Sequence, residues 1–212
     1  MDGPRVAEIG NRRSTIVLYS KSDCIACHRV RLALSEKGVQ AAIVTVDDDT
    51  ENADLLAANP QGQLPTLVDR DLVLYDARVI IDYLDERYPH PPLMPMDPVS
   101  RARVRLTLHR IESEWYALRP DACGQTLSKE DATRQLAESL TEASDVFAAM
   151  PYFFSDDYSV LDATLAPLLW RLPTYGILLP EVASPVKHYA KRMFARPGFQ
   201  ASLSGIEREM AQ

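Results

Sequence analysis

Five prolines fall within the ten residues from Pro89 to Pro98, in the stretch PHPPLMPMDP. Proline fixes its own φ, lacks the N–H group that helices and sheets use, and restricts the residue before it. Only extended or polyproline geometry is compatible with this density, so the stretch divides the chain of 212 residues into two parts. The expected division is a flexible tail at 1–13, a first domain at 14–89, a stiff linker at 90–100 and a helical domain at 101–212.

The first part opens with a strand–helix–strand pattern. Thr15–Tyr19 and Ala41–Val46 are short, apolar, β-branched runs, which are typical of buried strands. Between them a helix is expected from Ala26 to Lys37, with Gly38 ending it. Because the connections are short and contain one helix, the two strands should be parallel and form a βαβ unit.

A weak short helix before Pro60, a hairpin and a longer helix should complete the first domain. Thr66–Val68 and Leu72–Tyr75 alternate like hairpin strands around a turn at 69–71. Apolar residues recur on one face of residues 76–88, which indicates an amphipathic helix. The resulting order βαβαββα is that of a thioredoxin-like domain, so the predicted fold class is an α/β domain followed by an all-α domain.

Every segment after the linker has helical periodicity. Apolar residues repeat at i, i+4, i+7 and i+11 in two sets, namely Val104, Leu108, Ile111 and Trp115, and Leu136, Leu140, Ala143 and Phe147. Residues 161–172 are apolar on most sides and should form the buried centre of a helical bundle. Further helices are expected at 185–194 and 198–211.

Composition limits the expected partners and location. The net charge is −7, so a broad basic face for nucleic acid is not expected. No apolar run approaches the ~20 residues of a membrane span, and residues 1–14 lack the apolar core of a secretory signal. Three cysteines fit a reducing compartment better than a disulfide-stapled secreted fold. We therefore expect a cytoplasmic protein that contacts neither nucleic acid nor membrane directly.

Cys24 and Cys27 form a Cys-x-x-Cys pair where the first strand leads into the first helix. A thiol at a helix N-terminus has a lowered pKa, and a second thiol one turn later can resolve a mixed disulfide. Asp23, beside Cys24, opposes thiolate formation. Two interpretations stay open. Cys24 is either the nucleophile of a redox enzyme, or an exposed residue beside a Cys27 that only fills the core.

Three features resemble the glutathione transferase superfamily. The segment QLPTLVDRD is similar to the one that carries a cis-proline there, which implies a cis peptide bond at Pro65. In SVLDATLAP, Ser159 and Asp162 have the spacing of a capping box, which the superfamily has at the start of its central C-terminal helix. The superfamily also holds the γ-glutamyl carboxylate of glutathione with an acidic residue followed by Ser or Thr. The matching pair here is Asp76 and Ala77.

Ala77 lacks the hydroxyl group of that glutathione site. A hydrogen bond to a charged group is worth on the order of 1.5–3 kcal/mol, so one anchor for glutathione is lost, although backbone N–H groups at the helix end remain. The alternative is that Asp76 only caps its helix. No cofactor is expected unless the chain is an enzyme, in which case the cofactor would be glutathione.

A closer resemblance extends over nearly the whole chain, from about residue 14 to residue 210. The stretches VRLALSEKGV, PTLVDRDLVLYDARVIIDYLDERYPHPPLMP, LHRIESEWY and LAPLLWRLP are similar to the stringent starvation protein A family of bacteria. This resemblance implies a homodimer of glutathione transferase fold that associates with RNA polymerase, through sigma factor, core enzyme or both, in stress and starvation responses. It implies no transferase activity. The alternative is a glutathione-dependent thiol transferase, or glutaredoxin-like enzyme, that uses Cys24.

The same resemblance assigns partner binding to the proline segment, because the family's Pro-His-Pro element lies in a surface pocket required for regulation. The implied docking residues are Pro89, His90, Pro91, Pro92, Leu93 and Met94. Rigid prolines lose little entropy on binding, and we expect His90, Leu93 and Met94 around a pocket rim, where His90 could also make the contact pH-sensitive. The alternative is an interdomain linker without further function.

Basic residues open the second part of the chain: Arg101, Arg103, Arg105, His109 and Arg110. They could anchor an acidic partner, line a dimer contact, or form a solvated face that pairs with Glu112 and Glu114. No metal site is expected, because the histidines are scattered and the group of Cys24, Cys27 and His28 lacks a fourth ligand at usable spacing.

Overall fold

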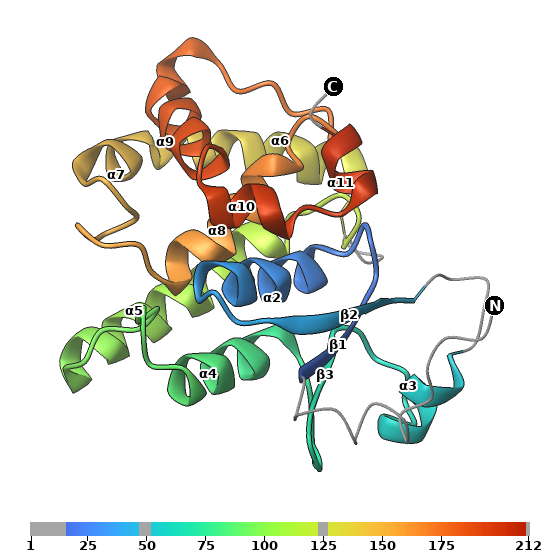
Figure 1. Ribbon diagram of the computed structural model, residues 1–212. Helices are drawn as coiled ribbons and strands as arrows, with labels where there is room; N and C mark the ends of the chain where they lie inside the picture. The colour runs from blue at the N-terminus through green and yellow to red at the C-terminus, as the bar shows by residue number, and fades with distance from the viewer. Residues whose placement is uncertain (1–15, 47–51, 123–126, 211–212) are drawn as a thin grey trace. The chain divides into compact units, whose positions relative to one another are not determined.

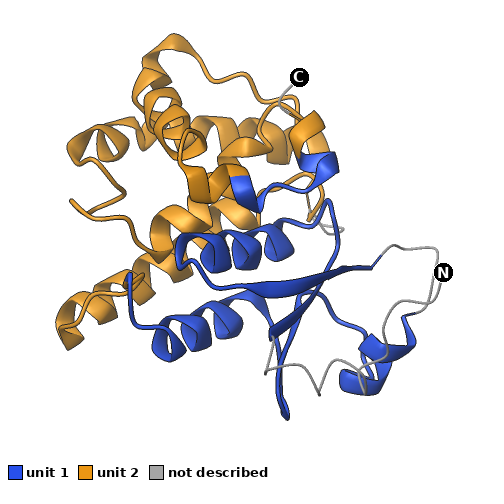
Figure 2. Cartoon of the chain, in the orientation of Figure 1, with its two compact units in different colours: residues 1–91, 201–207 blue, residues 92–200, 208–212 orange. Residues whose placement is uncertain are grey.

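A computed structural model describes residues 16–46, 52–122 and 127–210 (Figure 1). The expected tail at 1–13, Thr15 of the first expected strand and Cys123 lie outside these residues. The chain divides into two compact units, one of residues 1–91 and 201–207 and the other of residues 92–200 and 208–212 (Figure 2). The boundary between the units after residue 91 falls inside the proline segment.

The described part of the first unit contains a four-stranded mixed sheet of order β2-β1-β3-β4. β1 (Ile16–Ser20) pairs in parallel with β2 (Ala41–Thr45), with Ile16 opposite Ala41. β3 (Thr66–Asp69) is antiparallel to β1 and forms a hairpin with β4 (Leu72–Tyr75). The predicted parallel βαβ unit and the predicted hairpin are both confirmed, because both depend on local spacing and turn residues.

Helices cover the sheet of the first unit: α2 (Ile25–Glu36), α3 (Ala53–Ala58) and α4 (Ala77–Arg87). Val17 and Tyr19 of β1 pack against Leu55 of α3. Neighbouring strand residues point to opposite faces, so Leu18, which is also fully buried, points to the other face. The central strand is therefore buried on both sides. α2 ends as predicted, because Gly38 takes a φ of +64° that favours glycine.

Residues 201–207 belong to the first unit through a buried polar network on α2. Arg31 Nη2 donates to Glu207 Oε2 at 2.6 Å, and His28 Nδ1 lies 3.3 Å from Glu207 Oε1. The other ring nitrogen of His28 lies 3.1 Å from Ser202 Oγ. Glu207 and His28 are fully buried, and buried charges are tolerated only when they are paired. The network therefore fastens this late segment to α2.

The chain end is broken where one helix over 198–211 was expected. The structure has α10 (Pro197–Ser202) and α11 (Gly205–Glu209) instead. Ser204 Oγ accepts the N–H of Glu207 at 3.1 Å, and the N–H of Ser204 donates to Glu207 Oε2 at 2.9 Å. This reciprocal capping box starts a new helix at that point, which explains why the continuous prediction was wrong.

The described residues of the second unit form helices and their connections. They are α5 (Pro98–Arg110), the π-helical turn η1 (Ile111–Tyr116), α6 (Lys129–Glu142), α7 (Ser144–Ala149), α8 (Val160–Trp170), the 3₁₀ turn η2 (Glu181–Ala183) and α9 (Ser184–Phe194). Every residue of α8 from Val160 to Leu169 is buried, so the prediction of a central apolar helix is confirmed. No helix among the described residues is long and apolar enough to cross a membrane.

Helix boundaries in the second unit correct two expectations. α5 begins at Pro98, inside the expected linker, because Asp97 accepts the Ser100 N–H at 2.8 Å and proline is favourable in a first helical turn. The apolar repeat expected to be one helix spans α6 and α7, which separate at Ala143. Leu136 and Phe147 are buried on either side of the break, so periodicity alone could not reveal it.

We predict that Glu207→Ala lowers the free energy of unfolding by about 3–5 kcal/mol, because it leaves the buried Arg31 without its carboxylate partner. Glu209→Ala is the matched control, since Glu209 lies on the same short helix and is exposed. Urea unfolding of both variants measures the difference. Equal stability of the two variants would contradict the network's role.

Candidate functional site

The proline segment is fixed by hydrogen bonds within each unit. Lys37 follows the last residue of α2, and its buried Nζ donates to the carbonyl of Pro91 and to Asp85 Oδ1, both at 2.7 Å. In the second unit the carbonyl of Leu93 accepts the N–H of Val160, the first residue of α8, at 2.9 Å. A buried ammonium group requires such partners, so the backbone of the segment has a defined position at both points.

The docking residues expected in this segment fall into an exposed and a buried group. Pro89, His90, Pro91 and Pro92 are exposed, whereas Leu93 and Met94 are only 2% and 4% exposed. The expectation that Leu93 and Met94 surround a pocket rim with His90 is therefore corrected. The carbonyl of Leu93 is bonded to the N–H of Val160 within the second unit, so only the prolines and His90 of the expected docking residues are exposed.

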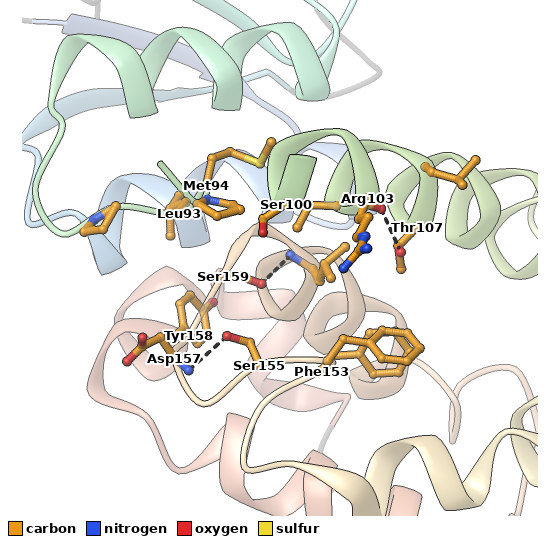
Figure 3. Close-up of a pocket in the computed structure, with 16 residues that line it drawn as sticks. Leu93, Met94, Ser100, Arg103, Thr107, Phe153, Ser155, Asp157, Tyr158 and Ser159 are labelled. Carbon is orange, nitrogen blue, oxygen red and sulfur yellow. Dashed lines mark hydrogen bonds between the residues drawn. The ribbon is translucent and has the colours of Figure 1, made fainter. Parts of the chain in front are cut away.

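Leu93 and Met94 line a pocket of about 640 Å³ that lies wholly within the second unit. Figure 3 shows Ser100, Arg103 and Thr107 of α5 on one side and Phe153, Ser155 and Tyr158 of the connection before α8 on the other. Most of the lining is apolar or aromatic, with a few polar groups among it. This combination and size are typical of a site for a small molecule or for a partner's side chain.

Asp162 organises the wall of this pocket. Its Oδ1 accepts the N–H of Phe153 at 2.9 Å and the hydroxyl of Tyr189 at 2.7 Å, and its Oδ2 accepts the N–H of Ser159 at 2.8 Å. The predicted capping box of Ser159 and Asp162 is confirmed. Burial raises the pKa of Asp162, and these hydrogen bonds oppose the rise. The fully buried carboxylate of Asp162 thus holds three places: the pocket wall at Phe153, the start of α8 at Ser159, and α9 at Tyr189.

Phe154 also lines the pocket, but it was not identified as a site residue from the sequence. It is 57% exposed although it is aromatic, and its φ of +58° is rare for a residue with a side chain. Its ring contacts the buried Phe153 edge to face at 4.7 Å between centroids. The aromatic run Tyr152–Phe154 shortly before the capping box was the only signal in the sequence, and it is compatible with a core segment.

The structure places Cys24 and Cys27 at the start of α2 with different surroundings. Cys24 is the N-cap residue and is partly exposed, whereas Cys27 is fully buried, and both are reduced thiols rather than a disulfide. The hydrogen bond between the two thiols and the burial of Cys27 raise the pKa of Cys27. Lys21 Nζ lies 3.7 Å from Asp23, which offsets the negative charge that was expected to oppose a thiolate.

The residues matching a glutathione site are arranged as follows. The Leu64–Pro65 peptide bond is cis, as the resemblance implies. Asp76 is exposed, and its Oδ1 accepts the N–H groups of Arg78 at 2.9 Å and Val79 at 3.2 Å. These are the backbone donors that a bound carboxylate would need. Ala77 is buried, and the side chain of Asp76 already caps this helix end.

The basic residues of α5 do not act as one group. Arg103 lines the pocket, while Arg110 Nε pairs with Glu114 Oε1 at 3.1 Å on an exposed face. Arg105 and His109 are exposed. The solvated-face interpretation therefore holds for Arg110, and Arg103 is the cation at the pocket. Within residues 16–46, 52–122 and 127–210, no group of three or more His, Cys, Asp or Glu residues is placed to hold a metal ion.

Comparison with known proteins places this geometry in context. Residues 18–92 match the family model "Glutathione S-transferase, N-terminal domain". A stringent starvation protein A homolog of Pasteurella multocida is 45% identical over 195 residues, which cover 91% of this chain and 92% of that protein. One from Coxiella burnetii is 44% identical over 203 residues, with coverages of 95% and 97%.

The solved structure of a Tau class glutathione S-transferase from mango aligns with a TM-score of 0.78 over 93% of this chain and 96% of that one. The two sequences are 24% identical, so this likeness concerns the fold alone.

We predict that Asp162→Asn destabilises the chain more at acidic than at neutral pH. Because the folded pKa of Asp162 is raised, the folded chain binds this proton more tightly than the unfolded chain. The carboxyl group therefore contributes most below its unfolded pKa of about 4, and its contribution falls as pH rises through the folded pKa.

Denaturant unfolding at a series of pH values measures this effect, with the exposed Asp145→Asn as the control. A loss for Asp162→Asn that does not change with pH would rule out the titration of a buried carboxyl.

Proposed function

Because the chain belongs to the stringent starvation protein A family, with the glutathione S-transferase fold, we propose that it is a non-catalytic regulator. Its partner is RNA polymerase holoenzyme, bound through sigma factor, core enzyme or both, and it acts in the cytoplasm during stress or starvation. The observation that carries this proposal is that Pro89–Pro92 are exposed while the backbone of the segment is held by hydrogen bonds.

The geometry of the proline segment supports docking. Its side chains are exposed, while its backbone is held by Lys37 at Pro91 and by Val160 at Leu93. A segment that is ordered before contact pays little conformational entropy on binding. Leu93 and Met94, which follow the exposed residues in the chain, line the pocket of the second unit.

The helix end at Asp76 supports a role without glutathione chemistry. A bound γ-glutamyl carboxylate would compete with the Asp76 side chain for the N–H groups of Arg78 and Val79. Ala77 offers no hydroxyl group that would offset this cost. The transferase frame is retained, and one of its substrate contacts is replaced by self-capping.

A homodimer is part of the proposal. Each unit exposes large apolar side chains, with Tyr75 of β4 and Val79 of α4 at 51% and 49% in the first unit and Val99 and Leu106 of α5 at 61% and 62% in the second. Burial of such side chains between two copies of the chain would favour association. Sedimentation equilibrium should give twice the chain mass, and a Leu106→Glu variant should shift the equilibrium towards the monomer.

Capture of polymerase tests the docking segment. We predict that a tagged chain captures purified RNA polymerase holoenzyme, and that His90→Ala/Pro91→Ala lowers capture by about tenfold or more, the equivalent of ~1.4 kcal/mol. Leu178→Ala is the control, because Leu178 is 88% exposed in the second unit and outside the segment. Undiminished capture by the double variant would rule out the proline segment as the docking surface.

A second candidate function is thiol transfer at Cys24, favoured by its position as the N-cap of α2. An assay with glutathione and a mixed-disulfide substrate decides between the two. Turnover that is lost in Cys24→Ser would establish the enzyme, whereas turnover unaffected by that change would exclude Cys24 as the nucleophile.

A further inference from the structure

The cysteine pair of α2 has an asymmetry that the docking function does not use. Cys24 is partly exposed at the N-cap, and Cys27 is fully buried one turn later. Residues at i and i+3 share a helix face, so the two thiols lie on one face about one turn apart, and Cys24 is close enough to raise the pKa of Cys27. A reagent from solution can therefore reach Cys24, and the sulfur of Cys27 is already beside the product of that reaction.

We propose that Cys24 and Cys27 form a redox modification site, which closes to a reversible intramolecular disulfide by exchange with a low-molecular-weight disulfide such as oxidised glutathione. This site is independent of polymerase docking. It changes the state of the protein once per oxidant and requires no turnover, which distinguishes it from a transferase.

The exchange proceeds in two balanced steps. The thiolate of Cys24 attacks one sulfur of the small disulfide, so a Cys24–sulfur bond forms, the disulfide bond breaks, and one small thiolate leaves and takes up a proton. Cys27 then releases its proton and attacks the Cys24 sulfur, which expels the second small molecule as a thiol. Overall two protein thiols are oxidised and one disulfide is reduced to two thiols.

Neighbouring groups support both steps. The N-terminus of α2 stabilises negative charge on the Cys24 sulfur, and Lys21 lies within 3.7 Å of Asp23 and offsets its charge. The backbone N–H of Lys21 donates to Cys27 Sγ at 3.4 Å, where it stabilises the thiolate that forms when Cys27 releases its proton before the attack. An apolar residue in place of Cys27 would fill the same part of the core but could not accept this hydrogen bond from Lys21.

Thiol counting on the whole chain tests the proposal, with Cys123→Ser as the background so that only the pair reports. We expect oxidised glutathione to remove both thiols from alkylation, to lower the intact mass by two hydrogens, and to leave no retained glutathione. Dithiothreitol should restore both thiols. In Cys27→Ser, or in Cys27→Ala if the serine variant does not fold, one glutathione should remain on Cys24. Cys24→Ser should stay unmodified while folded.

Two results would overturn the proposal: a lasting glutathione adduct on Cys24 while Cys27 is present, or two thiols that remain unmodified in the folded chain. Native alkylation gives a direct rate comparison, and we expect Cys24 to react at least about tenfold faster than Cys27. Faster reaction of Cys27 would contradict the assigned order of attack. Circular dichroism of each variant shows whether it is folded.

Discussion

The buried ammonium group of Lys37 fixes the feature on which the proposed function depends. A charge in this position has to be paired, and its partners are Asp85 and the carbonyl of Pro91. Lys37, the C-cap residue of α2, therefore holds the proline segment at the carbonyl of Pro91. In the second unit Asp162 plays a comparable part, because its buried carboxylate holds the pocket wall and the capped start of α8. The hydrogen bonds that pair Lys37 and Asp162 therefore also fix the positions of nearby residues of the proline segment and of the pocket wall.

Local patterns in the sequence predicted much of the fold, and interactions between distant residues account for what they missed. The βαβ unit, the hairpin, the central helix and the box of Ser159 and Asp162 depend on short-range spacing and were predicted correctly. Lys37 resembles any lysine near a helix end, and nothing near Glu207 reveals that Arg31, 176 residues away, is its partner. The position of Leu93 is likewise linked to a distant residue, because its carbonyl accepts the N–H of Val160.

The first unit has the fold of the glutathione S-transferase N-terminal domain. Asp76 caps α4 by accepting the N–H groups of Arg78 and Val79, and Ala77 follows it where a hydroxyl residue was expected for a glutathione site. α2 has a cysteine pair at its start, and Lys37, which bonds to the carbonyl of Pro91, directly follows its last residue. The 12 residues of this helix span about 18 Å. The same helix thus separates the proposed redox site from the residue that holds the proposed docking segment.

Hydrogen–deuterium exchange of the chain, alone and bound to RNA polymerase holoenzyme, tests whether polymerase docks on the proline segment. Prolines carry no amide hydrogen, so His90, Leu93 and Met94 report for the segment, and residues 153–159 report for the pocket wall beside it. We expect slower exchange in a peptide over 88–96 when polymerase is bound, with no change over 201–207. Unchanged exchange over 88–96, with protection confined to other surfaces, would contradict it.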